Sequence, residues 1–205
     1  MEFQVWIAFV AASMALLLIP GPTIMLVLSY ALSRGRTVAV TTALGVAFGD
    51  LIAMSASLLG LGALVLASAS WFMALKWIGA LYLIYLGIKL IRSAPEAQLG
   101  TVENNSAKGV FWHAALVTAL NPKGIVFFIA FVPQFVDANA ALLPQFAILI
   151  ATFVILAGLN ALAYALLADR MRRKIAKPAV IIWMTRMGGA VLVAMGGITI
   201  MLRRA

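Results

Sequence analysis

The chain has 205 residues, of which 65% are hydrophobic and 10% are charged, and its mean hydropathy is +1.10. About a quarter of the residues of a soluble domain are charged, so this composition excludes an ordinary water-soluble protein and indicates an integral membrane protein. The net charge of +9 does not indicate nucleic-acid binding, because the Lys and Arg residues form short clusters between apolar runs. The absence of cysteine excludes disulfides, thiolate metal sites and thiol redox chemistry.

The first apolar stretch is interrupted near its middle by Pro20, Gly21 and Pro22, and Thr23 follows. Proline lacks a backbone N–H and disfavours the helical conformation in the residue before it, so a helix that reaches this point must unwind. Inside a membrane, unwound backbone is tolerated only where protein or a water-filled cavity surrounds it. The break is therefore a candidate binding site.

Six apolar stretches are long enough to cross a membrane, which takes about 20 residues. They lie at about residues 5–33, 38–67, 71–92, 110–134, 144–168 and 183–202. The first three belong to a predicted unit at residues 1–92 and the last three to a second unit at residues 110–205. The polar residues 93–109 form a predicted cytoplasmic linker between the two units. The sequence thus predicts an all-α integral membrane protein with six transmembrane helices.

Lys and Arg residues are distributed unequally between the two sides of these predicted spans. The connections after the first, third and fifth spans hold Arg34, Arg36, Lys89, Arg92, Lys108, Arg170, Arg172, Arg173, Lys174, Lys177 and Arg186. The opposite side holds Lys76, Arg203 and Arg204. The positive-inside rule therefore places the first set in the cytoplasm and both termini outside. Arg203 and Arg204 oppose this placement for the C-terminus, whose side stays open.

The two predicted units resemble each other in sequence. Pro22 and Pro122 each lie near the middle of the first span of their unit, and Asp50 and Asn160 each lie near the middle of the second span. The third spans share Gly-Ala and Gly-Ile pairs at equal spacing. Because each unit has three spans, the second unit enters the membrane from the opposite side. The pattern predicts two inverted three-helix repeats with broken helices 1 and 4, an architecture of secondary transporters that bind substrate at the midplane.

Two charged residues lie at mid-span depth, Asp50 in the second span and Lys123 beside the Asn121-Pro122 break. A charge at this depth must face a partner, a cavity or a proton, because its burial in lipid is costly. Asp50 is a candidate proton-coupling residue, and a structural ion pair or a permanently neutral acid is the alternative. Lys123 is the natural partner of Asp50, and a lysine that extends to the membrane surface is the alternative.

Other polar side chains are weaker candidates. Asn160, Tyr164 and Thr118 are placed to line the same cavity, although each is equally suited to bond a neighbouring helix. His113, the only histidine, lies at the start of the fourth span and is expected at the membrane interface rather than in a proton relay. The sequence contains no nucleotide-binding P-loop and no hydrolase motif, so neither an enzyme nor a cofactor is expected.

Several of these motifs together resemble the lysine-exporter and homoserine/threonine-exporter (LysE/RhtB) family. They are Pro20-Gly21-Pro22, Gly49-Asp50, Gly79-Ala80-Leu81-Tyr82-Leu83 with Leu86-Gly87, and Asn121-Pro122-Lys123. The resemblance covers nearly the whole chain. It implies a multi-pass exporter of amino acids or close derivatives in the bacterial inner membrane, driven by the proton gradient, with a periplasmic N-terminus from the charge distribution. The wider superfamily includes metal efflux proteins, which leaves a divalent or heavy-metal cation exporter as an alternative.

The sequence hypothesis is amino-acid export by alternating access, with protons and the lipid bilayer as further partners. The expected substrate-binding residues are Pro20, Gly21, Pro22, Thr23, Asn121, Pro122, Lys123 and Asn160, and Asp50 is expected to exchange a proton. Lys123 and the amides freed at the breaks would hold the substrate carboxylate, and freed carbonyls with Asp50 its ammonium. A membrane-embedded enzyme is the second alternative. Glycine-rich faces also allow a homo-oligomer.

Overall fold

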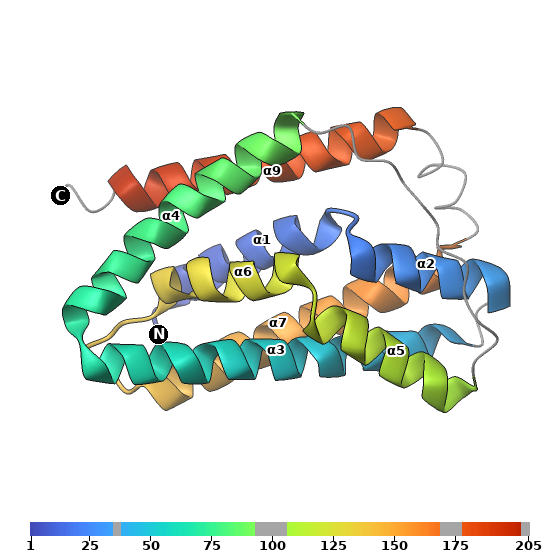
Figure 1. Ribbon diagram of the computed structural model, residues 1–205, viewed down its shortest axis with the longest axis horizontal. Helices are drawn as coiled ribbons and strands as arrows, with labels where there is room; N and C mark the ends of the chain where they lie inside the picture. The colour runs from blue at the N-terminus through green and yellow to red at the C-terminus, as the bar shows by residue number, and fades with distance from the viewer. Residues whose placement is uncertain (35–37, 93–105, 169–177, 202–205) are drawn as a thin grey trace.

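The computed structural model describes residues 1–34, 38–92, 106–168 and 178–201, and every regular element in these ranges is a helix (Figure 1). The elements are α1 (Phe3–Leu18), α2 (Pro22–Arg34), α3 (Ala39–Ala67), α4 (Ala69–Arg92), α5 (Ala107–Ala119), α6 (Pro122–Ala130), the 3-10 helix η2 (Val132–Phe135), α7 (Leu142–Leu166) and α9 (Pro178–Met201). The predicted cytoplasmic linker lies mostly outside the described residues. So do Arg36, Arg203, Arg204 and the basic residues between 170 and 177.

Three of the described helices are each long and apolar enough to cross a membrane: α3, α4 and α7. Two further pairs are bent at short breaks, α1 with α2 by 56° and α5 with α6 by 46°, and counting each pair as one span gives up to five spans in the described chain. The predicted sixth span coincides with α9, a helix of 24 residues that this count does not include. The predicted helices are confirmed, whereas six spans in two inverted repeats remain a prediction.

Both breaks lie where the sequence predicts them. Ile19 and Asn121 each precede a proline and each has an extended backbone, with φ and ψ of −75° and 117° at Ile19 and −68° and 113° at Asn121. A residue before proline avoids the helical region because its N–H and Cβ collide with the proline ring. The first helix of each bent pair therefore ends at its break, and Pro22 and Pro122 begin the second helices, where no N–H is needed.

Two clusters of buried side chains pack on either side of the breaks. One is aromatic and joins α6 to α7 and α1: the rings of Phe128 and Phe153 lie 4.9 Å apart, and those of Phe127 and Phe131 lie 4.8 Å apart. The other joins α2, α3, α5 and α7 through small and aliphatic residues such as Ala43, Ala114, Ala161 and Ala165. The small residues let the helix backbones approach closely, as is common in membrane proteins.

Helix α3 makes its closest contact with α5, and the two run in the same direction. A Cβ atom on Gly45 would lie 2.5 Å from the carbonyl oxygen of Phe111, and one on Gly49 would lie 2.5 Å from that of Ala115. No larger side chain fits at these two positions without separating the helices. Gly49 precedes Asp50, so this contact fixes the depth of Asp50 relative to the break that follows α5.

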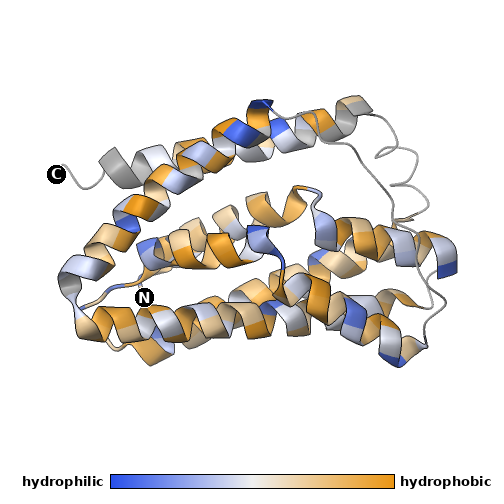
Figure 2. Ribbon diagram, viewed as in Figure 1, coloured by the Kyte–Doolittle hydropathy of each residue, from blue (hydrophilic) through white to orange (hydrophobic). Residues whose placement is uncertain are grey.

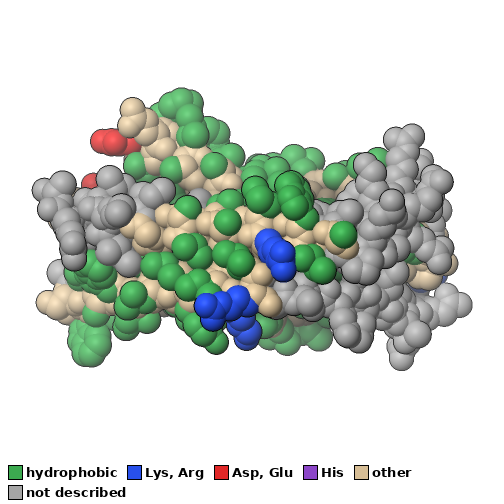
Figure 3. Space-filling model, turned by 90° about the horizontal axis from the view of Figure 1, so that it is seen from above, with side chains coloured by type: hydrophobic (Ala, Val, Ile, Leu, Met, Phe, Trp, Pro, Cys, Tyr) green, Lys and Arg blue, Asp and Glu red, His purple; other side chains and the backbone are tan. Residues whose placement is uncertain are grey.

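Helices α4 and α9 form an antiparallel pair along one side of the bundle (Figure 1). They meet at small residues: a Cβ on Gly87 would lie 2.5 Å from the carbonyl oxygen of Gly189, and one on Gly196 would lie 2.7 Å from that of Ala80. Seen from this side, the surface carries mainly hydrophobic side chains and a few Lys and Arg side chains (Figure 3). Elsewhere on the surface, α3 exposes Leu59 and Leu66, and α7 exposes Leu143. Large exposed apolar side chains of this kind are typical of a surface that faces lipid.

Candidate functional site

The last four carbonyl groups before the first break all accept hydrogen bonds from side chains of the second half of the chain. The ammonium of Lys123 donates to the carbonyl oxygens of Leu16 and Ile19, both at 2.8 Å. The Asn160 side-chain amide donates to Leu17 at 3.1 Å, and the Tyr164 hydroxyl donates to Leu18 at 3.1 Å. The final carbonyls of a helix have few partners within the helix. Here three side chains from α6 and α7 replace those missing partners.

Lys123 reaches the end of α1 because of where α6 begins. It is the second residue of α6, and its side chain crosses from the second break to the first. Gly21 leaves room for it: a Cβ on Gly21 would lie 3.5 Å from Cδ and 3.7 Å from Nζ of Lys123. The C-terminal end of a helix carries partial negative charge, so a cation is stabilised there. The alternative of a lysine extending to the membrane surface is therefore wrong.

Asn160 and Tyr164 lie on one face of α7, one turn apart, since residues four positions apart on a helix are neighbours. They bond adjacent carbonyls of α1, at Leu17 and Leu18. The pair therefore fixes the end of α1 to α7. Both residues were sequence candidates for the cavity; Asn160 lines it, whereas Tyr164 is not among the lining residues, and no residue pattern indicated which carbonyls the two side chains bind.

At the second break, both ends of the Asn121 side-chain amide form hydrogen bonds. The Asn121 side-chain oxygen accepts a hydrogen bond from the backbone N–H of Lys123 at 3.0 Å, which caps the start of α6. The Asn121 side-chain nitrogen donates to the Thr23 hydroxyl at 3.0 Å. This bond joins the second break to the first turn of α2. The corresponding position before Pro22 is Gly21, which has no side chain to cap α2.

Asp50 is buried on α3 and faces the space between the breaks. Among the described residues it forms no hydrogen bond and no ion pair, and Lys123 is bonded to carbonyls instead. Both residues nevertheless line the same cavity. The expectation of Lys123 as the natural partner of Asp50 thus holds for their shared location, not for a direct contact.

A small cavity of about 50 Å³ lies between the two breaks. Its walls are formed by Leu16, Leu17, Ile19, Gly21, Thr23, Ile24, Val46, Asp50, Asn121, Lys123, Gly124, Phe153, Ala157 and Asn160. Ligand pockets usually measure about 300 to 1,000 Å³, so the cavity in this conformation accommodates one small polar group rather than a whole amino acid. Figure 2 shows the α5–α6 break as a hydrophilic stretch between apolar helices.

The cavity collects most of the residues that the sequence singled out. Gly21, Thr23, Asn121, Lys123 and Asn160 line it together with Asp50. The predicted prolines shape the breaks and are not among the lining residues: Pro20, Pro22 and Pro122. Their part in substrate binding stays a prediction. The apolar walls, such as Val46 and Phe153, had no signal in the sequence that separated them from ordinary packing residues.

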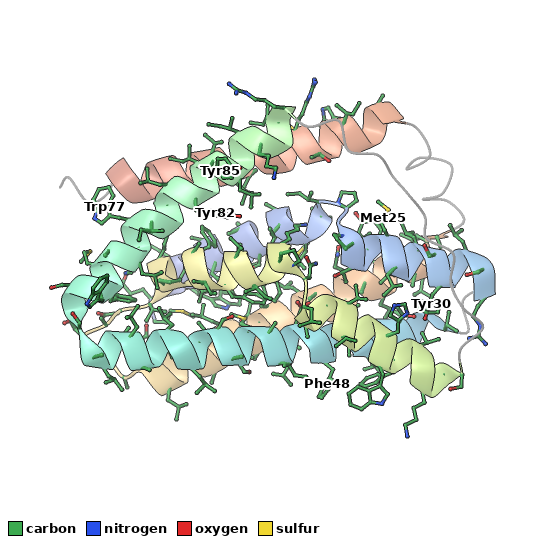
Figure 4. All side chains as sticks on the ribbon, viewed as in Figure 1. Met25, Tyr30, Phe48, Trp77, Tyr82 and Tyr85 are labelled. Carbon is green, nitrogen blue, oxygen red and sulfur yellow. The ribbon has the colours of Figure 1, made fainter. Side chains whose placement is uncertain are left out.

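A second polar contact lies apart from the cavity, between α2 and α5. The Tyr30 hydroxyl and Nδ1 of His113 are 2.8 Å apart, and their rings meet edge to face with centroids 5.8 Å apart. Figure 4 shows Tyr30 between these two helices. Tyr30 is fully buried, whereas His113 is exposed, and the expected interfacial position of His113 stays a prediction. No residue pattern indicated Tyr30 as its partner.

The comparisons with known proteins identify the family of this chain. The family model described as LysE type translocator matches residues 14–202, nearly the whole chain. The chain belongs to this translocator family. The resemblance found in the sequence motifs is therefore confirmed, and the family is one of transport proteins with apolar helices, as the composition predicts.

Individual relatives match over 64% to 100% of their own length. A homoserine/homoserine lactone efflux protein of Salmonella typhimurium is 32% identical over 206 residues, which is 100% of both chains. An uncharacterized membrane protein of Vibrio cholerae is 32% identical over 197 residues, 96% of each chain. A membrane protein of Pseudomonas aeruginosa is 37% identical over 139 residues, 65% of this chain and 64% of the relative. No solved structure matches the chain.

Proposed function

We propose that the protein exports a small neutral amino acid or a close derivative from the cell, by alternating access in exchange for protons. The observation that carries the proposal is the cavity where Asp50, Lys123 and the ends of two broken helices meet inside a membrane protein of a translocator family. A relative named as a homoserine/homoserine lactone efflux protein supports a substrate of that size and polarity. The bacterial inner membrane and a periplasmic N-terminus are part of this proposal.

The substrate carboxylate binds at the start of α2. The start of α6 is already capped by Asn121, whereas the start of α2 follows Gly21, which has no side chain to accept a hydrogen bond from the first N–H groups. The first helical residues with an N–H, Thr23 and Ile24, line the cavity. A helix N-terminus with unsatisfied N–H groups favours an anion. A substrate carboxylate there would take the part that the Asn121 side chain takes at α6.

Asp50 is the proton-coupling residue of this proposal. It is the only described carboxylate on a candidate membrane span, it lines the cavity, and no described side chain bonds it. A mid-membrane acid that faces a cavity changes charge when its hydration or its neighbours change. Asp50 would accept a proton from one side and release it to the other as the two repeats rock around the cavity.

A transport assay in proteoliposomes tests the proposal. Wild-type protein should exchange labelled homoserine for unlabelled homoserine, and an imposed pH gradient should drive net transport. Asp50→Asn keeps the size of the side chain but cannot ionise, so we expect loss of gradient-driven transport. Undiminished gradient-driven transport in this variant would exclude Asp50 from coupling.

The matched control is Asp137→Asn, which removes an exposed carboxylate before α7 and should leave transport unchanged. A panel of threonine, leucine, lysine and homoserine lactone tests the substrate class. Transport of lysine alone would contradict the preference for neutral substrates, and transport of none of the panel would overturn amino-acid export.

A further inference from the structure

The site that should receive a substrate ammonium already holds one. Lys123 places its ammonium on the carbonyl oxygens of Leu16 and Ile19, at 2.8 Å from each. An α-amino acid carries the same group, a primary ammonium with three N–H donors. Both carbonyls belong to residues that line the cavity, as does Lys123 itself.

We propose that the carbonyl pair of Leu16 and Ile19 is the subsite for the substrate's primary ammonium, and that Lys123 occupies it as a tethered competitor until substrate displaces it. This inference rests on the proposed function. It adds the order of events: binding is an exchange of one ammonium for another, rather than the filling of an empty site.

Charge explains why an exchange is favoured over an empty subsite. The carbonyls lie at the negative end of the α1 dipole, and without Lys123 the Ile19 oxygen would have no described partner and the Leu16 oxygen would keep only the backbone N–H of Ile19, at 3.2 Å. An incoming ammonium takes over both hydrogen bonds, so the subsite holds one cation before and after. A quaternary ammonium has no N–H donors and an N-acylated amine has no charge, so neither replaces Lys123.

The four carbonyls at the end of α1 have two kinds of partner, and this difference fits the proposed exchange. Leu17 and Leu18 are bonded by Asn160 and Tyr164, neutral side chains fixed on the rigid helix α7. These bonds hold the end of α1 in place while the other two carbonyls change partner. Lys123, in contrast, sits on a flexible four-carbon stem in the first turn of α6.

The released Lys123 ammonium remains in the cavity, where two carboxylates can accept its hydrogen bonds. Asp50 lines the same cavity and is not bonded by another described side chain. The substrate carboxylate, if bound at the start of α2, is the other. Substrate binding therefore delivers a cation to the acid that the proposed function uses for proton exchange, which links the two events physically.

The inference defines the substrate class by one chemical group. Homoserine and its lactone both keep a primary ammonium, and both should compete with Lys123. N-acetylhomoserine retains the carboxylate and hydroxyl but lacks the ammonium, so it should neither compete nor be transported.

The test restores the missing ammonium of Lys123→Ala with a small amine. This variant leaves a gap that n-propylammonium matches in length and charge. Thermal unfolding of the purified variant in detergent is followed against amine concentration. We expect a saturable rise in Tm with n-propylammonium and none with tetramethylammonium. Wild-type protein and Lys89→Ala, which removes an exposed lysine of α4, should show no such rise.

Competition then identifies the subsite. At a homoserine concentration ten times its own Kd, the apparent Kd of n-propylammonium for Lys123→Ala should rise about elevenfold, as for two ligands sharing one site. N-acetylhomoserine should cause no change. A saturable amine effect that homoserine leaves unchanged would show that the substrate ammonium binds elsewhere, and the absence of any amine effect would show that the carbonyl pair is no cation site.

A second variant and a parallel transport measurement complete the test. If Lys123→Ala does not fold, Lys123→Met retains the volume of the stem and is tested with the ammonium ion in place of n-propylammonium, with the same two overturning outcomes. Wild-type transport is measured in parallel, and the competitor is an amino acid that the wild type transports. If the wild type transports an amino acid that does not compete with n-propylammonium for Lys123→Ala, this inference alone is overturned. If the wild type transports no amino acid, the proposed function is overturned as well.

Discussion

The break between α1 and α2 and the break between α5 and α6 both place a proline at the start of the second helix, yet different residues hold them. At the first break, the carbonyls of α1 are bonded by Lys123, Asn160 and Tyr164, which lie more than 100 positions further along the chain. At the second break, Asn121 caps the next helix itself.

This difference indicates which break can change its conformation. A local cap depends only on neighbouring residues, so the second break keeps its shape whenever α6 is folded. The first break depends on contacts with α6 and α7, and these contacts change whenever the two halves move relative to each other. We therefore expect the contacts at the end of α1 to hold while substrate binds and to rearrange in the later transport step, with α6 as the scaffold that carries Lys123 to this end.

Filling the first break should have the largest effect on transport. Gly21→Leu places a branched side chain against the Lys123 stem, because even a Cβ at this position lies 3.5 Å from Lys123 Cδ. We expect homoserine exchange to fall to background while the protein still inserts and remains monodisperse in detergent. Gly21→Ala, which adds only that Cβ at an ordinary contact distance, is the matched control and should retain transport. Equal activity of the two variants would contradict a closely fitted first break.

Separating α3 from α5 should chiefly reduce stability. A Cβ in Gly49→Ala would lie 2.5 Å from the Ala115 carbonyl oxygen and 2.8 Å from Thr118 Cβ, and backbone cannot move aside locally. Overpacking of this kind costs about 1 to 3 kcal/mol. Gly60→Ala on the same helix has nothing within 4 Å and should leave Tm unchanged or slightly raised. Similar Tm values for the two variants would contradict the close helix contact.

Removing one side chain from each break compares the two directly. Asn160→Ala leaves the Leu17 carbonyl unpaired at the first break, and Asn121→Ala removes the cap at the second; each should cost about 1 kcal/mol. We expect Asn160→Ala to slow homoserine exchange more than Asn121→Ala does, per folded protein and at matched Tm loss. The reverse order would identify the second break as the one that rearranges.

The smallest effect is expected for the contact between α2 and α5. Tyr30→Phe removes the hydrogen bond to His113 and keeps the ring contact, and such bonds between membrane helices are worth about 0.6 kcal/mol on average. We expect a slightly lower Tm and unchanged homoserine exchange, since both residues lie outside the cavity. A strong loss of exchange would show that the α2–α5 contact takes part in the conformational change.

The helices were largely predictable from apolar runs and prolines. The second predicted span, residues 38–67, became α3 at Ala39–Ala67, and the fifth, residues 144–168, became α7 at Leu142–Leu166. Both breaks fell at the predicted prolines. These features are local: a run of apolar residues must be helical in lipid, and a proline removes a donor wherever it stands.

The candidate site was predictable in its residues but not in its contacts. Asp50, Lys123 and Asn160 stood out because polar side chains are costly in the middle of a span. Lys123, expected as the partner of Asp50 with direct pairing left open, bonds the carbonyls of Leu16 and Ile19 instead. Every residue has a carbonyl, so no residue type in the sequence distinguishes these two from their neighbours.

The sequence by itself determined that this chain is helical, membrane-embedded, broken at Pro22 and Pro122, and a member of a translocator family. The tertiary structure decided which groups satisfy the broken backbone. That choice depends on how α6 and α7 pack against the end of α1. A hydrogen bond requires a donor–acceptor distance of about 3 Å, and packing over the whole bundle sets this distance. Through this packing, the first break holds an ammonium from the chain itself where the substrate's ammonium is expected.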